Sequence, residues 1–194
     1  MKRLAMATLL LMCSACIQLG SDPLPMRHYL LQPNAGAQQL SLDSAVEFTL
    51  DPLRFPAYLD RLQLTSHNDQ HQVLIAPQDR WSEPLEESIT RVVNENLARH
   101  LLDGRTQAQS DRSTDSQKVQ LALTINSFDG ILGQNIDVDI RWTITRAGDS
   151  EQIQHGHFID KASIGSSHAE LVRGLNAALD RFSYALAQAV ARSL

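Results

Sequence analysis

Cys16 is the residue whose chemistry is indicated most specifically by its surroundings. It follows a positively charged start, a short apolar stretch and the small residues Ser14 and Ala15, the pattern of a bacterial lipoprotein signal. The apolar stretch of about nine residues falls well short of the roughly 20 that a membrane-spanning helix needs. We therefore expect cleavage before Cys16, a diacylglycerol on its thiol and a further acyl chain on its amine, which together anchor a protein durably.

The lipoprotein signal departs from the usual pattern at one position. Cys13 stands three residues before Cys16, where Leu is usual, and cleavage before Cys13 is less favourable because bulky Met12 would precede it. The alternative is an ordinary secretory leader cleaved after Ala15, which would leave Cys16 a free thiol. Ile17, rather than Asp, follows Cys16, so the sequence has no inner-membrane retention signal and favours the outer membrane, facing the periplasm.

Two pairs of histidines could serve as metal ligands. His155 and His157 are two residues apart on an expected strand and so share a face, while His67 and His71 flank an expected turn. Neither pair has a third Cys or His at close spacing, so partly exposed strand and turn histidines are the better interpretation. We expect no metal and no cofactor.

Paired carboxylates and a glycine-serine segment were the remaining candidates for catalysis. Asp137 and Asp139 share a strand face with Arg141, an arrangement more typical of cross-strand ion pairs than of an acid–base couple. The segment Gly165-Ser166-Ser167 lacks the spacing of a phosphate-binding loop or a nucleophile elbow, and helix capping accounts for it. We therefore expect that the protein is not an enzyme.

Composition limits the classes of partner. The chain has 17 basic and 22 acidic residues and a net charge of −5, which argues against nucleic acid as a ligand. Both cysteines lie in or at the end of the leader, so the mature body must be stabilised by an apolar core, which 43% hydrophobic content can supply. We divide the chain into a signal peptide (1–15), a lipid-anchored tether (16–25) and a single domain (26–194).

The strands are predicted from alternation and from turn residues. The strongest period-two patterns are residues 119–126 and 136–145, which place apolar residues on one face and polar residues on the other. Further strands are expected over His28–Leu31, Ala45–Leu50, Arg61–Ser66, Gln72–Ala76 and Gln152–Asp160.

Two helices are predicted from apolar stripes with a spacing of three or four. The first covers Glu83–Leu102, and the second runs to about Ala191 from a capping box formed by Ser167 and Glu170. The polar face of the second helix mixes both charge signs, which favours packing in the core over binding to a membrane. The expected fold is α+β: an antiparallel sheet with two helices packed on one face, in two layers.

Four segments carry a resemblance to a known family. They are Tyr29-Leu30-Leu31, the run from Phe55 to Arg61, the run from Arg80 to Leu85, and a turn at Phe128-Asp129-Gly130 before the acidic strand. Together they resemble the PqiC/YmbA family, the auxiliary lipoproteins of MCE-type (ABC-linked) intermembrane lipid transport. The similarity covers the whole mature chain.

The resemblance implies an outer-membrane lipoprotein that meets an MCE-domain protein, associates with copies of itself and has no catalytic residues. It also implies that Cys16 is the lipid anchor. The residues of the family motif, to which it assigns a structural or partner-binding role, are Pro56, Tyr58, Leu59, Asp60, Arg61, Arg80, Trp81, Pro84 and Leu85. The apolar loop at Phe55 and Tyr58 could be a partner contact or a satellite of the core. Two rival functions stay open, assistance to assembly of a β-barrel machine and an anchored hydrolase.

Overall fold

The structure is a computed structural model that describes residues 25–34, 36, 38–40, 46–101, 105–106, 117–146 and 152–194. The leader, Cys16 and nearly all of the expected tether therefore lie outside the described residues. The elements are β1 (Arg27–Tyr29), β2 (Val46–Leu50), the 3-10 helix η2 (Ala57–Leu59), β3 (Gln63–His67), β4 (Val73–Trp81), α2 (Leu85–His100), β5 (Arg105–Thr106), β6 (Gln117–Ile131), β7 (Asn135–Arg146), β8 (Gln152–Asp160) and α3 (His168–Ser193).

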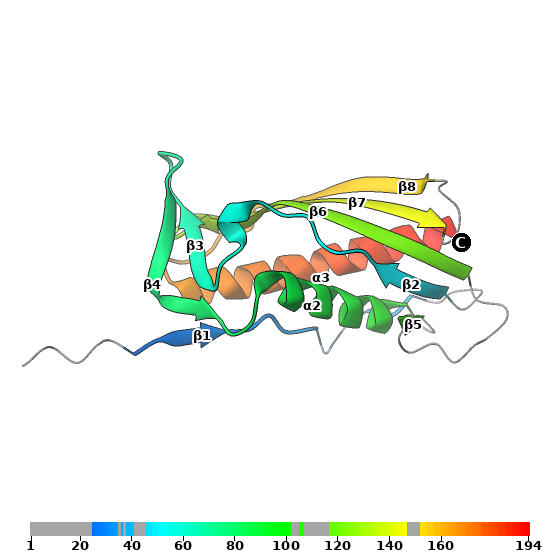
Figure 1. Ribbon diagram of the computed structural model, residues 1–194, viewed down its shortest axis with the longest axis horizontal. Helices are drawn as coiled ribbons and strands as arrows, with labels where there is room; N and C mark the ends of the chain where they lie inside the picture. Colours follow the sequence, from blue (N-terminus) through cyan, green and yellow to red (C-terminus); the bar gives the residue numbers. More distant parts are fainter. Residues whose placement is uncertain are drawn as a thin grey trace, which may run out of the picture.

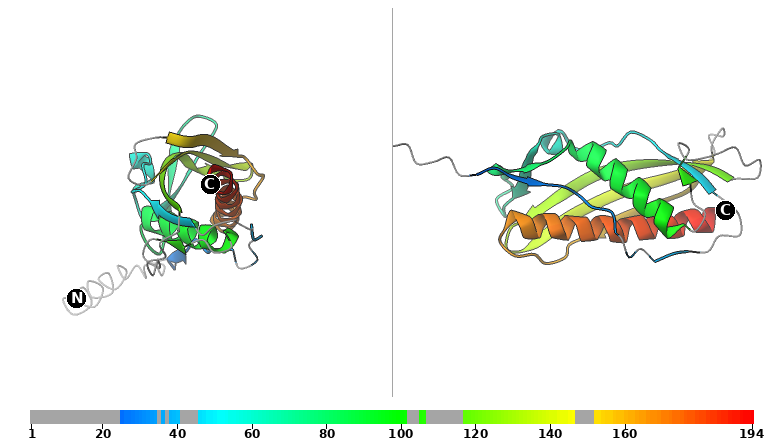
Figure 2. Two further views of the ribbon diagram at one scale, coloured as in Figure 1. Left: turned by 90° about the vertical axis from the view of Figure 1, so that its right-hand side faces the viewer. Right: turned by 90° about the horizontal axis from the view of Figure 1, so that it is seen from below.

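The larger sheet has the strand order β5-β2-β6-β7-β8 and curves around α3 (Figures 1 and 2). The antiparallel meander β6-β7-β8 confirms the prediction from alternation, and its pairing runs from Val119 opposite Arg146 to Ile131 opposite Asn135. The inward faces of β6 and β7 are apolar and buried against the helices. Away from the end of the sheet where β3 and β4 lie, the outward face carries polar and partly exposed residues.

The expectation of a purely antiparallel sheet is wrong. β2 runs parallel to β6 and to β5, with Phe48 opposite Val119 and Thr106. The chain between β2 and β6 includes three strands and an α-helix, which is long enough for the crossover that a parallel neighbour requires. Alternation along a strand reports which face is buried, but not the direction of the neighbouring strand.

A second sheet, also mixed, has the order β1-β4-β3 and lies across one end of the molecule (Figure 1). The prediction of one sheet that includes these strands is therefore wrong. β4 is longer than predicted because it continues past Pro77, and its last residues, Asp79 to Trp81, pair in parallel with β1. This smaller sheet covers the outward face of β6 near Asp129. The molecule therefore has three layers at this end instead of two.

Both helices pack on the inward face of the larger sheet, as predicted. The stripe of α2 is buried throughout, and α3 buries Leu171, Leu175, Leu179, Phe182, Leu186 and Val190. The capping box is present: the Ser167 hydroxyl accepts from the Glu170 N–H at 3.2 Å, and the Glu170 carboxylate accepts from the Ser167 N–H at the same distance. The boundaries of α2 differ from the prediction by two residues at each end.

The turn predicted at Phe128-Asp129-Gly130 is wrong, because these residues belong to β6. The chain reverses later, where Gly133 adopts a φ of +79° that other residues rarely take. A register shift between Ile125 and Ser127 keeps Phe128 on the buried side of the sheet. Gly130 resembles a turn residue in the sequence, but it is required by close packing: a Cβ there would lie 2.5 Å from the carbonyl oxygen of Asn135.

Candidate functional site

The specific motif segments converge on the smaller sheet. The 3-10 helix η2 starts after Pro56 and buries Leu59, and the β4–α2 corner buries Trp81 and Leu85. The Trp81 N–H donates to the Leu62 carbonyl at 2.7 Å, which links the end of β4 to the approach to β3. Several of these apolar motif residues therefore belong to the hydrophobic core, at the end of the molecule where the smaller sheet lies.

The remaining motif residues lie at the margins of this part of the core. Asp60 follows η2 and is exposed, and Pro84 occupies the position before the first residue of α2, where its missing N–H costs nothing. Arg61 and Arg80 are partly buried. Phe55 and Tyr58 pack partly buried against the core, which favours the interpretation of this loop as a core satellite.

A buried carboxylate that the motif analysis did not single out holds β1 in place. Asp79 is 2% exposed and accepts hydrogen bonds from the Arg27 guanidinium at 2.7 Å twice and from the Tyr29 hydroxyl at 2.8 Å. His168, at the start of α3, places Nδ1 3.1 Å from the same carboxylate. Burial opposes ionisation, but these hydrogen bonds and charges prevail and hold the pKa of Asp79 below its usual range.

A second buried carboxylate lies between the two sheets. Asp129 of β6 is 2% exposed, with one oxygen 3.4 Å from Nδ1 of His67 in β3 and the other without a hydrogen-bond partner. Burial raises the pKa of Asp129 even though His67 and Tyr58 favour its charged form. Burial, together with the nearby Asp129 carboxylate, raises the pKa of Tyr58 well above its usual range, so its hydroxyl remains protonated.

The predicted acidic pair lies on the outward face of β7, as expected. Asp139 accepts from Asn126 at 2.7 Å and contacts His157 at 2.9 Å, and Asp137 lies 3.8 Å from Lys161. These contacts agree with the prediction of cross-strand ion pairs. Within the described ranges, no three His, Cys, Asp or Glu side chains are grouped so that they could hold a metal ion.

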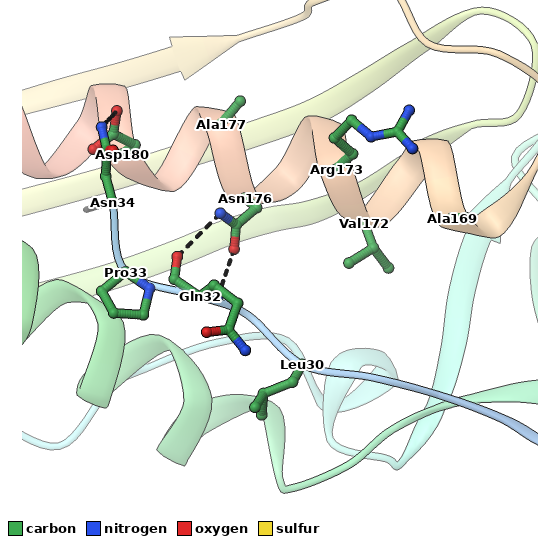
Figure 3. Close-up of a pocket in the computed structure, with 10 residues that line it drawn as sticks. All are labelled: Leu30, Gln32, Pro33, Asn34, Ala169, Val172, Arg173, Asn176, Ala177 and Asp180. Atoms are coloured by element: carbon green, nitrogen blue, oxygen red, sulfur yellow. Dashed lines mark hydrogen bonds between the residues drawn. The ribbon is translucent and has the colours of Figure 1, made fainter. Parts of the chain in front are cut away.

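A shallow groove of about 540 Å³ separates residues 30–34 from α3 (Figure 3). The Gln32 N–H donates to the Asn176 side chain at 2.7 Å, and the Asn176 amide donates back to the Gln32 carbonyl at 3.0 Å. Asn34 donates to Asp180 at 2.8 Å. Because these polar groups pair with one another across the groove, they fix the segment after β1 against α3.

Comparison with known proteins identifies the class to which this fold belongs. The model of the family described as "ABC-type transport auxiliary lipoprotein component" matches residues 29–187. The chain therefore belongs to this family, which includes PqiC/YmbA and so confirms the resemblance. The protein is an auxiliary lipoprotein of an ABC-type transport system. Among the described residues, no helix is both long and apolar enough to cross a membrane.

Solved structures share the fold at low sequence identity. A protein described only as uncharacterized is 17% identical, with a TM-score of 0.70 over 86% of this chain and 99% of its own. Protein XCC0632 from Xanthomonas campestris, of family DUF330, is 12% identical, with a TM-score of 0.65 over 86% of this chain and 95% of its own. No curated protein matches the sequence significantly.

Proposed function

We propose that the protein is the outer-membrane lipoprotein of an MCE-type intermembrane phospholipid transport system, where it docks the periplasmic MCE tunnel to the outer membrane. The observation that carries this proposal is the family match over residues 29–187, in a chain whose leader ends at Cys16 in the manner of a lipoprotein. The role is positional: lipid on Cys16 holds the domain at the inner leaflet, and a protein surface binds the shaft of the transporter. Self-association around the conduit is part of the proposal.

The outward face of β7 and β8 is the surface that we propose for the transporter contact. It carries Asp139 and His157 in a mutual contact, and Asp137 is joined to Lys161 at the edge. This stretch of sheet is partly exposed, whereas the Phe55–Tyr58 loop is packed against the core. A polar face with paired charges is typical of the rim of a non-obligate protein contact.

The experiment that tests the proposal is an affinity pull-down of the tagged, detergent-extracted lipoprotein, with its partners identified by mass spectrometry. Cys16→Ala serves as the control that removes the anchor. Recovery of an MCE-domain protein with the wild-type chain is expected. Recovery of a β-barrel protein alone, or of further copies of the chain and nothing else, would contradict the assignment.

A further inference from the structure

Two arginines, Arg80 in the smaller sheet and Arg61 just before it, each bury a guanidinium nitrogen that has no hydrogen-bond partner. Arg80 of β4 lies directly opposite Gln63 of β3 and beside His28 of β1. The bond from Trp81 to Leu62 continues the β3–β4 pairing towards Arg61, so Arg61 and Arg80 lie on neighbouring segments. The Nε atoms of both arginines are buried and have no hydrogen-bond partner, and neither side chain forms an ion pair within the described ranges.

Arg80 lies on the face of the smaller sheet that points away from the body of the molecule. The residues on either side of Arg80, Asp79 and Trp81, are buried against the body, and successive strand residues point to opposite faces. Arg80 therefore faces outward, together with Gln63 and His28. Figure 1 shows β3, β4 and β1 at one end of the molecule, with the helices and the larger sheet on one side of them only.

The acidic side chains nearest in sequence form no ion pair with these arginines. Asp79 is held by Arg27 at 2.7 Å, and Glu83 is held by Arg91 at 2.7 Å. Asp60 is exposed and forms no ion pair with a described residue. A covered guanidinium N–H without a partner is costly, and the fork of Nε and Nη matches the oxygens of a phosphate or carboxylate. The arrangement fits an anion supplied from outside the described chain.

The exposed apolar side chains on this sheet and beside its strands favour a lipid as the source of the anion. Leu62 is 45% exposed, and Val73, Leu74 and Ile75, consecutive in β4, are 45%, 45% and 49% exposed. Because neighbouring strand residues point to opposite faces, these three expose apolar surface on both sides of the hairpin. A phospholipid offers a phosphate and apolar chains together, whereas inorganic phosphate offers the phosphate alone.

The path of the chain connects the expected anchor at Cys16 to this end of the molecule. The described chain enters β1 from Pro25, and the segment between Cys16 and Pro25 reaches roughly 30 Å when fully extended. A membrane anchor on Cys16 would thus keep the smaller sheet within reach of lipid headgroups. We propose that Arg61 and Arg80 bind the phosphate of a phospholipid headgroup; the phosphate site rests on the structure, and the lipid source rests on the proposed function.

The test measures binding of water-soluble dihexanoyl phosphatidylglycerol, and separately of inorganic phosphate, to the full-length lipoprotein in non-ionic detergent by titration calorimetry. We expect saturable binding of the lipid that weakens by about tenfold or more in the double variant Arg61→Gln/Arg80→Gln. Arg173→Gln, at an exposed arginine of α3, is the control and should bind the lipid like the wild type. The double variant Arg61→Lys/Arg80→Lys keeps the positive charges but lacks the forked guanidinium groups. Its affinity for the lipid should lie between those of the wild type and the double Gln variant.

Each outcome decides the proposal. Equal binding by the wild type and the folded double Gln variant, with folding verified by thermal unfolding, would overturn the site. Binding of inorganic phosphate without binding of the lipid would overturn the lipid assignment. The pull-down described above, repeated with the double Gln variant, separates the two proposals. Retained recovery of the MCE protein with lost lipid binding supports both. If the wild type recovers no MCE protein but binds the lipid through these arginines, the proposed function is contradicted and the lipid site stands on its own measurement.

Discussion

Arg27 and Asp79, 52 residues apart in the sequence, form a two-pronged ion pair in which Nε and Nη2 of the arginine each lie 2.7 Å from a different carboxylate oxygen. The arginine is largely exposed, but the carboxylate is buried and also holds Tyr29 and His168. One side chain of β4 thus joins the first strand of the described chain to the start of the last helix.

Removing this carboxylate should loosen β1. We expect Asp79→Asn to lower the free energy of unfolding by about 2 kcal/mol, because the amide cannot replace the charge-assisted bonds. Chemical denaturation measures the loss, and hydrogen exchange should show faster exchange of β1 amides. Asp60→Asn, at an exposed carboxylate, is the control. The pKa of Asp79 is lowered in the fold, so its contribution is present above its ordinary pKa and is lost as the pH falls through the lowered value.

For Asp129 we predict the opposite pH dependence of stability from that of Asp79. Burial raises its pKa above the unfolded value of 3.8, so the folded state binds the proton more tightly. Its stabilising effect is therefore full below pH 3.8 and is lost as the pH rises through the raised pKa. Compared with Asp129→Asn, the wild type should gain unfolding free energy as the pH falls from neutral towards 3.8. Denaturation of both proteins across this range gives the difference, and a difference independent of pH would contradict the assignment.

The ring of Trp142 leaves no room for a side chain on β8. A Cβ at Gly156 would lie 2.2 Å from the ring, so Gly156→Ala should cost about 1–3 kcal/mol of stability. Thermal unfolding provides the measurement. The double variant Gly156→Ala/Trp142→Leu tests the cause, because removal of the ring should recover part of the cost; no recovery would point to the backbone instead.

The capping box of α3 should make a measurable contribution. Ser167→Ala removes the acceptor for the Glu170 N–H, and we expect a loss of about 1 kcal/mol in the free energy of unfolding. The neighbouring Ser166, which is exposed, provides the control substitution Ser166→Ala. Equal effects of the two substitutions would show that the cap has no special role.

The sequence predicted those parts of the fold that depend on local periodicity. Alternation located β6, β7 and β8, and the Ser167–Glu170 spacing located the start of α3 because both signals act within a few residues. The second sheet was missed because its pairing depends on distant contacts such as Arg27 with Asp79. The sequence singled out the motif segments but not their convergence, which is a tertiary property: residues near 30, 60 and 80 meet only after β4 pairs on both sides.

Asp79 and Asp129 could not have been distinguished from surface carboxylates by composition or spacing. Asp79 stands between Gln78 and Arg80 in a polar stretch, and Asp129 was assigned to a turn. The apolar residue Phe128, next to Asp129, could have indicated that the strand continues. The register shift between Ile125 and Ser127, however, interrupts the alternation on which the strand prediction depended. Both carboxylates are buried by tertiary contacts: Asp79 lies against β1 and the start of α3, and Asp129 lies beneath β3.

The parallel pairing of β1 with β4 has a mechanical consequence. A force applied to the chain before Pro25 enters the fold at β1, whose three residues pair along Asp79 to Trp81 and whose Arg27 is clamped to Asp79. Force along the strand axis then loads the inter-strand hydrogen bonds and the ion pair in shear, all at once, rather than opening them one after another. The contacts of β1 with β4 would thus bear a force applied at the anchored end of the chain and keep it from reaching the helices.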